Sequence, residues 1–222
     1  MKILALEFSS SQRSVAVLNV DAHANVLATS QVMEAASGNT MRPLGMIEAA
    51  LRDAGLERDQ IECLVVGLGP GSYNGIRVAI SLAQGWQLAS EIKLLGVSSA
   101  DCVAAQSHAD GRTGKVAVVI DAQRGEYYLA AYELSTRGWR VTSRLRLASA
   151  DEVRARQWSG AALIGPDVTR WFPGGQPVFP RATMLGHLAK GRRDFVPAEK
   201  LEPIYLREAR FVKAPPPRMV SG

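Results

Sequence analysis

Residues 63–77 read CLVVGLGPGSYNGIR, and this stretch decides the fold. Its first six residues form a short, continuously apolar run, which predicts a strand buried on both faces. Glycines at positions 67, 69, 71 and 75 predict a tight loop after that strand, and a largely apolar helix follows over residues 76–89. A buried strand that leads through a loop into a helix is typical of an α/β protein.

The glycine-rich loop has two interpretations. Backbone N–H groups at the start of a helix can hold a phosphate, which makes Gly69, Gly71 and Ser72 candidate contacts. Alternatively, the glycines only allow the strand and the helix to pack closely. The loop lacks the Gly-Lys-Ser/Thr ending of a Walker A loop, and Ser72 stands where the dinucleotide fingerprint needs glycine. The residues alone leave both interpretations open.

The helix over residues 76–89 is apolar on nearly all sides, with Arg77 as its only charge. Its apolar residues fall on two stripes, one with Ile76, Ala79, Ile80 and Ala83, the other with Val78, Leu82, Trp86 and Ala89. Such a helix must be covered on more than one side. The cover is either its own sheet and a neighbouring helix, or its sheet and another protein.

Strands and helices alternate along the rest of the chain. We expect strands near residues 3–8, 15–20, 26–32, 93–97, 116–121, 126–134, 140–147 and 161–165, and helices over residues 40–55, 98–106, 149–158 and 183–191. The polar residues 107–112 predict a linker, after which a strand, a polar turn and a strand recur as at the N-terminus. The pattern predicts an α/β fold with mixed sheets and suggests a duplicated unit.

Charge differs between the two halves of this 222-residue chain, whose formal net charge is +5. Residues 1–108 carry 7 Lys and Arg against 10 Asp and Glu, a net of −3, whereas residues 109–222 carry 19 against 11, a net of +8. A basic half is typical of contact with a polyanion or simply of a solvated surface. Its densest part holds Arg140, Arg144, Arg146, Arg154 and Arg156.

Metal catalysis and nucleophilic catalysis find no support in the sequence. His23, His108 and His187 lie far apart, and no Gly-x-Ser-x-Gly motif occurs. Cys63 and Cys102 stand in apolar segments, as buried thiols do in a reducing compartment. The opening apolar run is too short for a signal peptide, and no run approaches 18 apolar residues, so we expect a cytoplasmic protein.

Five segments match one family in order along the chain. Residues 69–77 follow a Gly-Pro-Gly-Ser-Phe-Thr-Gly-x-Arg hallmark loop, with Tyr73-Asn74 in place of Phe-Thr. The others are ILAL at residues 3–6, GVSS at 96–99, IDAQRGEYY at 120–128 and EPIYLR at 202–207. The combination resembles the TsaB (YeaZ) family, which consists of bacterial proteins of tRNA threonylcarbamoyladenosine biosynthesis and is classed as glycoprotease-like.

The resemblance implies two related domains of the actin-like (ribonuclease H-like) fold, with mixed sheets flanked by helices. We expect an N-terminal domain over residues 1–108 and a C-terminal domain over residues 109–222. A mobile Pro-rich tail at Pro215-Pro216-Pro217 ends the second domain, unless the tail packs back on the first.

The resemblance also implies a non-catalytic partner subunit with no metal. It would dimerise with the catalytic subunit TsaD, or with itself when alone, and cooperate with the ATPase TsaE. The complex transfers threonylcarbamoyl to the adenosine beside the anticodon of tRNAs that read A-starting codons. The implied partner surface lies on the first two helices, residues 40–55 and 74–89, through Leu44, Ile47, Leu51, Ile76, Ala79, Leu82, Ala83 and Trp86.

The alternative function is an ATP-binding enzyme or a peptidase-like protein of the same fold. ATP and magnesium would then bind at the interface with partners, near Glu7, Ser9, Gly69, Gly71, Ser72 and Asp121. Glu7 and Asp121 end the first strand of each repeated unit, where a carboxylate either holds magnesium or caps its hairpin. The family usually has Asp-Thr-Ser where this chain has Glu7-Phe8-Ser9. In the partner-subunit hypothesis, tRNA contact falls on the five arginines of the basic half.

Overall fold

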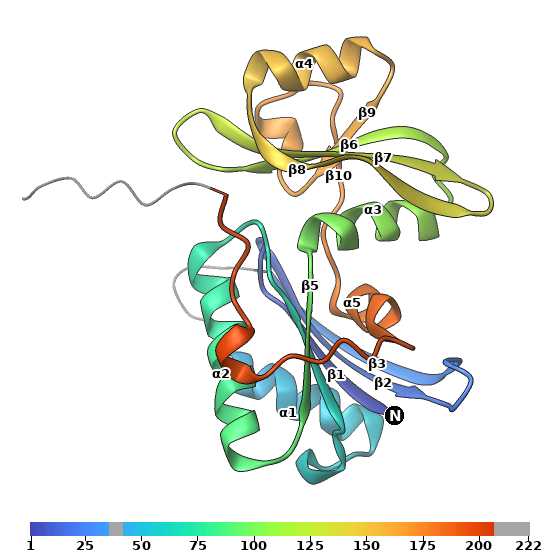
Figure 1. The fold of residues 1–222 in the computed structure, drawn as a ribbon, viewed down its shortest axis with the longest axis vertical. Coiled ribbons are helices and arrows are strands. Elements are labelled where there is room, and N and C mark those ends of the chain that lie inside the picture. Colours follow the sequence, from blue (N-terminus) through green and yellow to red (C-terminus); the bar gives the residue numbers. More distant parts are fainter. Residues whose placement is uncertain (36–41, 207–222) are drawn as a thin grey trace, which may run out of the picture.

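The computed structural model describes residues 1–35 and 42–206, which form two five-stranded sheets with helices on both faces of each (Figure 1). The expected helix start at Asn39-Thr40 and the Pro-rich tail at residues 215–217 lie outside these ranges. Within the ranges, no helix is both long enough and apolar enough to cross a bilayer.

The first sheet has the strand order β3-β2-β1-β4-β5. Its strands are β1 (Lys2–Glu7), β2 (Gln12–Val20), β3 (Val26–Ala35), β4 (Cys63–Gly67) and β5 (Lys93–Val97). The first three form an antiparallel meander, while β4 and β5 run parallel to β1. Every residue of β4 is buried, which confirms the prediction from its continuous apolar run.

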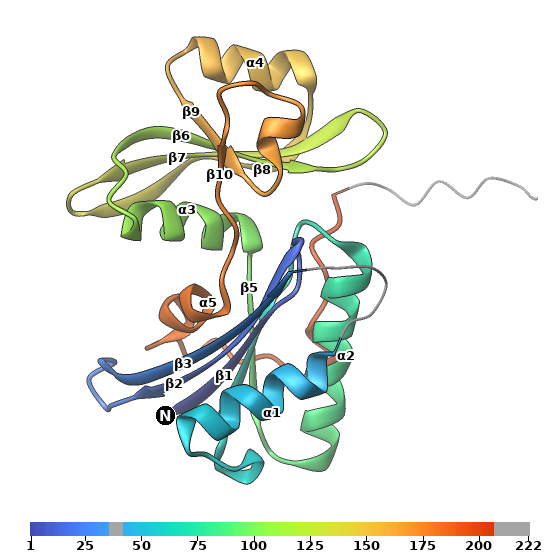
Figure 2. The same cartoon turned by 180° about the vertical axis from the view of Figure 1, so that it is seen from behind.

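Helices cover both faces of the first sheet. α1 (Pro43–Ala54) and α2 (Tyr73–Ala89) lie on one face, and α5 (Ala182–Ala189) lies on the other (Figure 2). Alternate residues of β1 show this division, because Leu4 and Leu6 pack with α1 and α2, whereas Ile3 and Ala5 pack with α5. Pro43 occupies the first turn of α1, where its missing N–H breaks no helical hydrogen bond.

The second sheet has the strand order β10-β9-β6-β7-β8. Its strands are β6 (Gly114–Asp121), β7 (Glu126–Ser135), β8 (Gly138–Ser149), β9 (Ala162–Gly165) and β10 (Gln176–Pro177). α3 (Ser99–Ala109) packs on one face and α4 (Ala150–Trp158) on the other. Three 3-10 helices complete the described elements: η1 (Arg58–Gln60), η2 (Val168–Arg170) and η3 (Ala198–Lys200).

The two halves repeat one topology. When β6 is aligned with β1, the two strand orders coincide, and each of these strands pairs antiparallel with its successor and parallel with the fourth strand of its half. α1 and α4 follow the third strands, and α3 and α5 follow the fifth. The duplication that two short hairpins suggested therefore extends through both halves. The expected architecture of two mixed sheets flanked by helices is confirmed.

The last helix of each half packs near the sheet of the other half. Ala100, Val103 and Ala104 of α3 belong to the core of the second sheet, whereas Leu185 and Ala189 of α5 belong to the core of the first. The expected boundary after residue 108 lies between the strands of the first sheet and those of the second. α3, however, packs with the second sheet and α5 with the first. Residues 107–109, predicted as linker, are the last turn of α3, because the buried face of that helix extends to residue 107.

Residues 190–206 form an extended segment, here called the strap, that returns from α5 across the first sheet to α2 (Figure 1). Val196 N–H donates to the carbonyl oxygen of Leu94 at 3.0 Å, which covers part of the open edge of β5. Further along, Leu201 is buried in the core beside α2, and Ile204 N–H donates to the carbonyl oxygen of Leu68 at 2.9 Å. The strap therefore brings the end of the described chain next to the glycine-rich loop.

Candidate functional site

The glycine-rich loop between β4 and α2 is in contact with the turn between β1 and β2. A Cβ atom on Gly71 would lie 2.1 Å from the carbonyl oxygen of Ser9, and one on Gly75 would lie 1.9 Å from that of Phe8. Gly71 also has a φ of +148°, which other residues rarely adopt. These glycines allow two backbone segments to approach within contact distance, as the packing interpretation of the loop requires.

Several N–H groups of the loop bind partners inside the protein. Ser72 N–H donates to the carbonyl oxygen of Ser9 at 2.7 Å, and Gly69 N–H donates to Ser99 Oγ at 3.1 Å. Gly75 N–H donates to Ser72 Oγ at 3.3 Å, because Ser72 caps α2. A phosphate site needs such groups to point at the ligand, so their internal use favours a packing role for this loop.

Glu7 is fully buried at the end of β1. Its Oε1 accepts the N–H of Ser9 at 2.7 Å, and its Oε2 accepts the hydroxyl of Ser99, at the start of α3, at 2.8 Å. Gly67 leaves room for the carboxyl, since a Cβ there would lie 2.2 Å from Oε2. Burial raises the pKa of Glu7, although the hydrogen bonds from Ser9 and Ser99 oppose that shift. Glu7 thus joins β1, the following turn and α3.

Glu7→Gln is expected to gain stability relative to the wild type as pH rises. The raised pKa of Glu7 means that the unfolded chain releases this proton at a lower pH than the folded protein does. Wild-type stability therefore falls from about the ordinary glutamate pKa of 4.5 up to the folded-state pKa, a loss that the amide lacks. Urea denaturation of both proteins between pH 4 and pH 8 measures the difference. A difference that is constant over this range would contradict the assignment.

Glu7→Ala serves as the control for this experiment. It leaves the Ser9 N–H and the Ser99 hydroxyl buried without their acceptor, which costs about 1–3 kcal/mol for each such group. We therefore expect the free energy of unfolding of Glu7→Ala to be lower than that of Glu7→Gln at every pH between 4 and 8.

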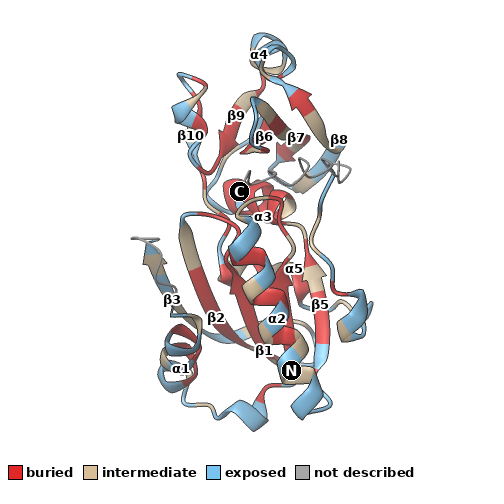
Figure 3. Ribbon diagram, turned by 90° about the vertical axis from the view of Figure 1, so that its left-hand side faces the viewer, coloured by how far each residue is buried: buried red, intermediate tan, exposed pale blue. Residues whose placement is uncertain are grey.

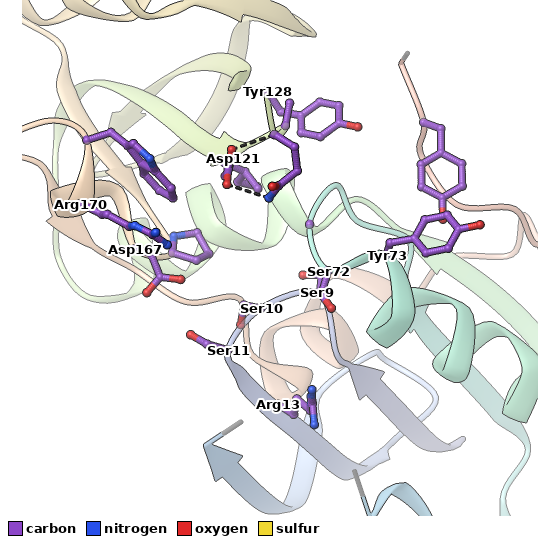
Figure 4. Close-up of a pocket in the computed structure, with 17 residues that line it drawn as sticks. Ser9, Ser10, Ser11, Arg13, Ser72, Tyr73, Asp121, Tyr128, Asp167 and Arg170 are labelled. Atoms are coloured by element: carbon purple, nitrogen blue, oxygen red, sulfur yellow. Dashed lines mark hydrogen bonds between the residues drawn. The ribbon is translucent and has the colours of Figure 1, made fainter. Parts of the chain in front are cut away.

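A cleft of about 630 Å³ opens between the two sheets, at the ends of β1 and β6 (Figure 4). Its walls come from the β1–β2 turn, the start of α2, the β6–β7 turn, residues 166–171 and the strap. Two arginines and two aspartates line it, so the lining has no excess of charge: Arg13, Arg170, Asp121 and Asp167. The remaining polar lining is mainly hydroxyl groups of serine and tyrosine.

The structure places four of the six predicted phosphate contacts at this cleft: Ser9, Gly71, Ser72 and Asp121. Glu7 and Gly69 do not line it. The Asp121 carboxylate accepts the N–H and the Nε2–H of Gln123, each at 2.8 Å (Figure 4). This pairing is the hairpin cap that the sequence left open as an alternative to a magnesium ligand.

Sequence reasoning missed Arg170, Trp171 and Tyr205 as cleft residues. The first two lie in a segment rich in proline and glycine that has no helical or strand periodicity. Tyr205 lies in the EPIYLR segment, which matched the family pattern but had no assigned role. That match was the available signal, and its meaning depends on the return of the strap to the cleft.

α2 turns one of its two apolar stripes inward and the other outward. Ile76, Ala79, Ile80 and Ala83 are buried against the first sheet. Val78, Leu82 and Trp86 are only half-buried, and Leu88 is 89% exposed. Figure 3 shows that α2 carries buried, intermediate and exposed residues along its length. The outward stripe is the one that another molecule can reach.

Only part of the predicted partner surface is accessible from outside the protein. Five of its eight predicted residues are buried in the protein's own core: Ile47, Leu51, Ile76, Ala79 and Ala83. These five residues lie on the sides of α1 and α2 that pack against the first sheet. Leu44 is 55% exposed, and Leu82 and Trp86 are half-buried, so these three remain accessible.

A shallow groove of about 430 Å³ runs along the outer face of α2. Its lining consists of Asn74, Arg77, Val78, Ser81 and Leu82. Val78 and Leu82 give it an apolar base, and Trp86 lies one turn of helix beyond Leu82. Half-buried apolar side chains within a polar surround are typical of a protein interface.

Three of the five arginines predicted to contact tRNA are paired with carboxylates. Arg140 pairs with Glu133, Arg146 with Glu152 at 2.7 Å, and Arg154 with Asp151 at 2.8 Å. Arg144 is exposed and Arg156 is half-buried, and neither forms an ion pair with any residue that the structure describes. The pairing reduces the local excess of positive charge around β8 and α4.

Metal ligands do not gather anywhere in residues 1–35 and 42–206, where no group of three His, Cys, Asp or Glu side chains could hold an ion. Cys63 and Cys102 are buried and free, as the sequence predicted. Burial raises the pKa of Cys63 to about 12 and that of Cys102 well above its ordinary value, so both thiols stay protonated. Neither is an activated nucleophile.

A protein-family model described as TsaD: tRNA N6-adenosine threonylcarbamoyltransferase matches residues 33–144, half of the chain. Among similar proteins, the tRNA threonylcarbamoyladenosine biosynthesis protein TsaB of Escherichia coli is 29% identical over 231 aligned positions, which cover 93% of this chain and 95% of that protein. The TsaB protein of Haemophilus influenzae is 27% identical and covers 97% and 98%.

Two solved structures from Pseudomonas aeruginosa share the fold. One is described as an uncharacterized protein with similarity to peptidase YEAZ, with a TM-score of 0.76, 27% identity and coverage of 93% of this chain and 99% of the other. The second, described as YeaZ, has a TM-score of 0.74, 26% identity and coverage of 92% and 99%. Sequence and structure are therefore similar over nearly the whole length.

Proposed function

Because the chain belongs to the TsaD family of tRNA N6-adenosine threonylcarbamoyltransferase proteins, and because its full-length relatives are TsaB and YeaZ proteins, we propose that it acts in tRNA threonylcarbamoyladenosine biosynthesis. Its role is that of a partner subunit rather than of the transferase. It binds the catalytic subunit TsaD and, together with the ATPase TsaE, supports transfer of threonylcarbamoyl to tRNA.

The outward stripe of α2 is the observation that carries this proposal. Val78, Leu82 and Trp86 are half-buried by the protein's own core and leave the rest of their surface to solvent. Leu44, 55% exposed, adds an apolar side chain from α1, the helix that covers the same face of the sheet. Tryptophan is among the residues that supply most of the binding energy in protein interfaces, and the neighbouring apolar side chains add contact area around it.

In the N-terminal half, polar groups that catalysis or ligand binding would use are hydrogen-bonded inside the protein. Glu7 is buried and hydrogen-bonded to two serines, and the loop N–H groups of Gly69 and Ser72 bind acceptors within the protein. These features support a role in which the subunit holds a partner in place. Contact with tRNA through Arg144 and Arg156 is part of the same proposal, because neither arginine pairs with a carboxylate within residues 1–35 and 42–206.

Co-expression with the TsaD protein of the same organism tests the partnership. We expect the two chains to co-elute in size-exclusion chromatography as a heterodimer, and this chain alone to elute as a homodimer through the same helices. A surface of about 1,000 Å² or more centred on α1 and α2 is needed for a stable complex. Elution of two separate monomers at micromolar concentration would contradict the proposal.

A further inference from the structure

The strap is held firmly along one side of α2. Gln84 Nε2 donates to the carbonyl oxygen of Ala198 at 3.0 Å, and Ala198 N–H donates to Gln87 Oε1 at 2.7 Å. Leu201 is 2% exposed, and the 2.9 Å bond from Ile204 N–H to Leu68 fixes the strap near its end. Surface built on the strap therefore has a defined position relative to α2.

A groove of about 460 Å³, here called the strap groove, lies between α2 and the strap. Arg77, Ser81 and Gln84 line it from the helix, and Glu199, Glu202 and Tyr205 line it from the strap. It is distinct from the groove on the outer face of α2, but the two share Arg77 and Ser81. The outward stripe of α2 and the strap are thus parts of one continuous surface.

The strap groove carries one cation, Arg77, and two carboxylates, Glu199 and Glu202. Arg77 is turned to Tyr73: its Nη1 donates to the Tyr73 hydroxyl at 2.7 Å, and its guanidinium lies 5.1 Å from the centre of that ring. Glu199 and Glu202 are exposed, and neither pairs with a cation in the described part of the chain. Two carboxylates are therefore available to a basic group from outside.

Tyr205 adds an aromatic surface beside these carboxylates. Its ring is stacked on Tyr73 with 5.5 Å between ring centres, and the residue is still 44% exposed. A guanidinium binds well where a carboxylate accepts its N–H groups and an aromatic ring lies under its plane. The groove combines both features, and Tyr73 holds the Tyr205 ring in place.

We propose that the surface that receives the transferase subunit continues from α2 onto the strap, where the groove binds an arginine-bearing segment of that subunit. This inference rests on the proposed function for the identity of the partner. The apolar stripe of α2 supplies contact area, and the strap groove supplies charge complementarity, which selects the correct partner and orients it. Tyr205, Glu199 and Glu202 are the recognition residues.

The test measures the affinity of the full-length chain for the TsaD protein of the same organism by calorimetry at low and moderate salt. We expect Glu199→Arg/Glu202→Arg to weaken binding at least tenfold and to reduce the salt dependence of the affinity. Tyr205→Ala is expected to weaken binding about fivefold or more, while Tyr205→Phe keeps the ring and the affinity. Thermal melts of each variant verify that the fold is intact.

Asp59→Arg/Asp110→Arg is the matched control, because both residues are exposed, lie outside the groove, form no ion pair in the described part of the chain and give the same change in net charge. It should bind like the wild type. If the variants at Glu199, Glu202 and Tyr205 bind TsaD as tightly as the wild type does, while Leu82→Asp weakens binding about a hundredfold, the inference is overturned and the proposed function stands. If neither strap variants nor Leu82→Asp weaken binding, the proposed interface itself is wrong. Tighter RNA binding by the strap variants with unchanged TsaD binding would also overturn the inference.

Discussion

Gly75→Ala is expected to destabilise the folded protein by about 3 kcal/mol, one of the largest effects of any single methyl group in this chain. The added Cβ would lie 1.9 Å from the Phe8 carbonyl oxygen and 3.0 Å from its carbonyl carbon. Both belong to backbone at the end of β1, in the tight contact between the β1–β2 turn and the loop, so neither can move aside as a flexible side chain would. The free energy of unfolding in urea measures the loss.

Gly85→Ala provides a control within the same helix. A Cβ at Gly85 meets no atom within 4 Å, and the residue is exposed. Alanine is the better helix former, so this variant should be more stable than the wild type by about 0.5–1 kcal/mol. If both substitutions change stability by the same amount and sign, the close contact at Gly75 does not exist.

A second pair of substitutions, Ala79→Asp and Leu82→Asp, separates the two faces of α2. Ala79 is fully buried, so an aspartate there places an unpaired charge in the core and should cost about 3–5 kcal/mol of stability. Leu82 is half-buried on the outward stripe, so the same residue there should cost about 1 kcal/mol. Thermal and urea denaturation of the isolated chain distinguish the two.

The same pair has the opposite order of effects on partner binding. Leu82→Asp brings a charge into the apolar centre of the proposed interface and should weaken TsaD binding by about a hundredfold. The fraction of Ala79→Asp that remains folded should bind almost normally, because its side chain faces the first sheet. Normal binding by a folded Leu82→Asp chain would remove α2 from the interface.

Much of the fold follows from local patterns in the sequence. The apolar run of β4, the alternation along β1 and β2, and the Pro43 and Gly55 ends of α1 each fix an element through nearby residues. The family resemblance, which the comparisons confirm, supplied the pairing of two such units. The resemblance did not predict that α3 packs on the second sheet and α5 on the first. These positions depend on contacts between segments that are distant in the sequence.

The candidate site shows the same limit at the level of side chains. The position of Glu7 at a strand end left a magnesium ligand and a hairpin cap as alternatives, and the sequence does not show that Ser99, distant along the chain, donates a hydrogen bond to this buried carboxyl. The two stripes of α2 are visible in the sequence, yet their spacing does not reveal which one faces the sheet. Tyr205 meets Tyr73 only because the strap folds back across β5. In each case the missing information is a contact between residues far apart in the chain.

Reconstituted threonylcarbamoyl transfer to tRNA is the most direct test of the central claim that this chain is a partner subunit. TsaD, TsaE and the threonylcarbamoyl donor of the same organism are combined with unmodified tRNA, with and without this chain, and the modified adenosine is quantified by mass spectrometry. We expect modification only when the chain is present, restored by the wild type and not by Leu82→Asp. Equal modification in its absence, or full restoration by a Leu82→Asp chain that no longer binds TsaD, would contradict the account.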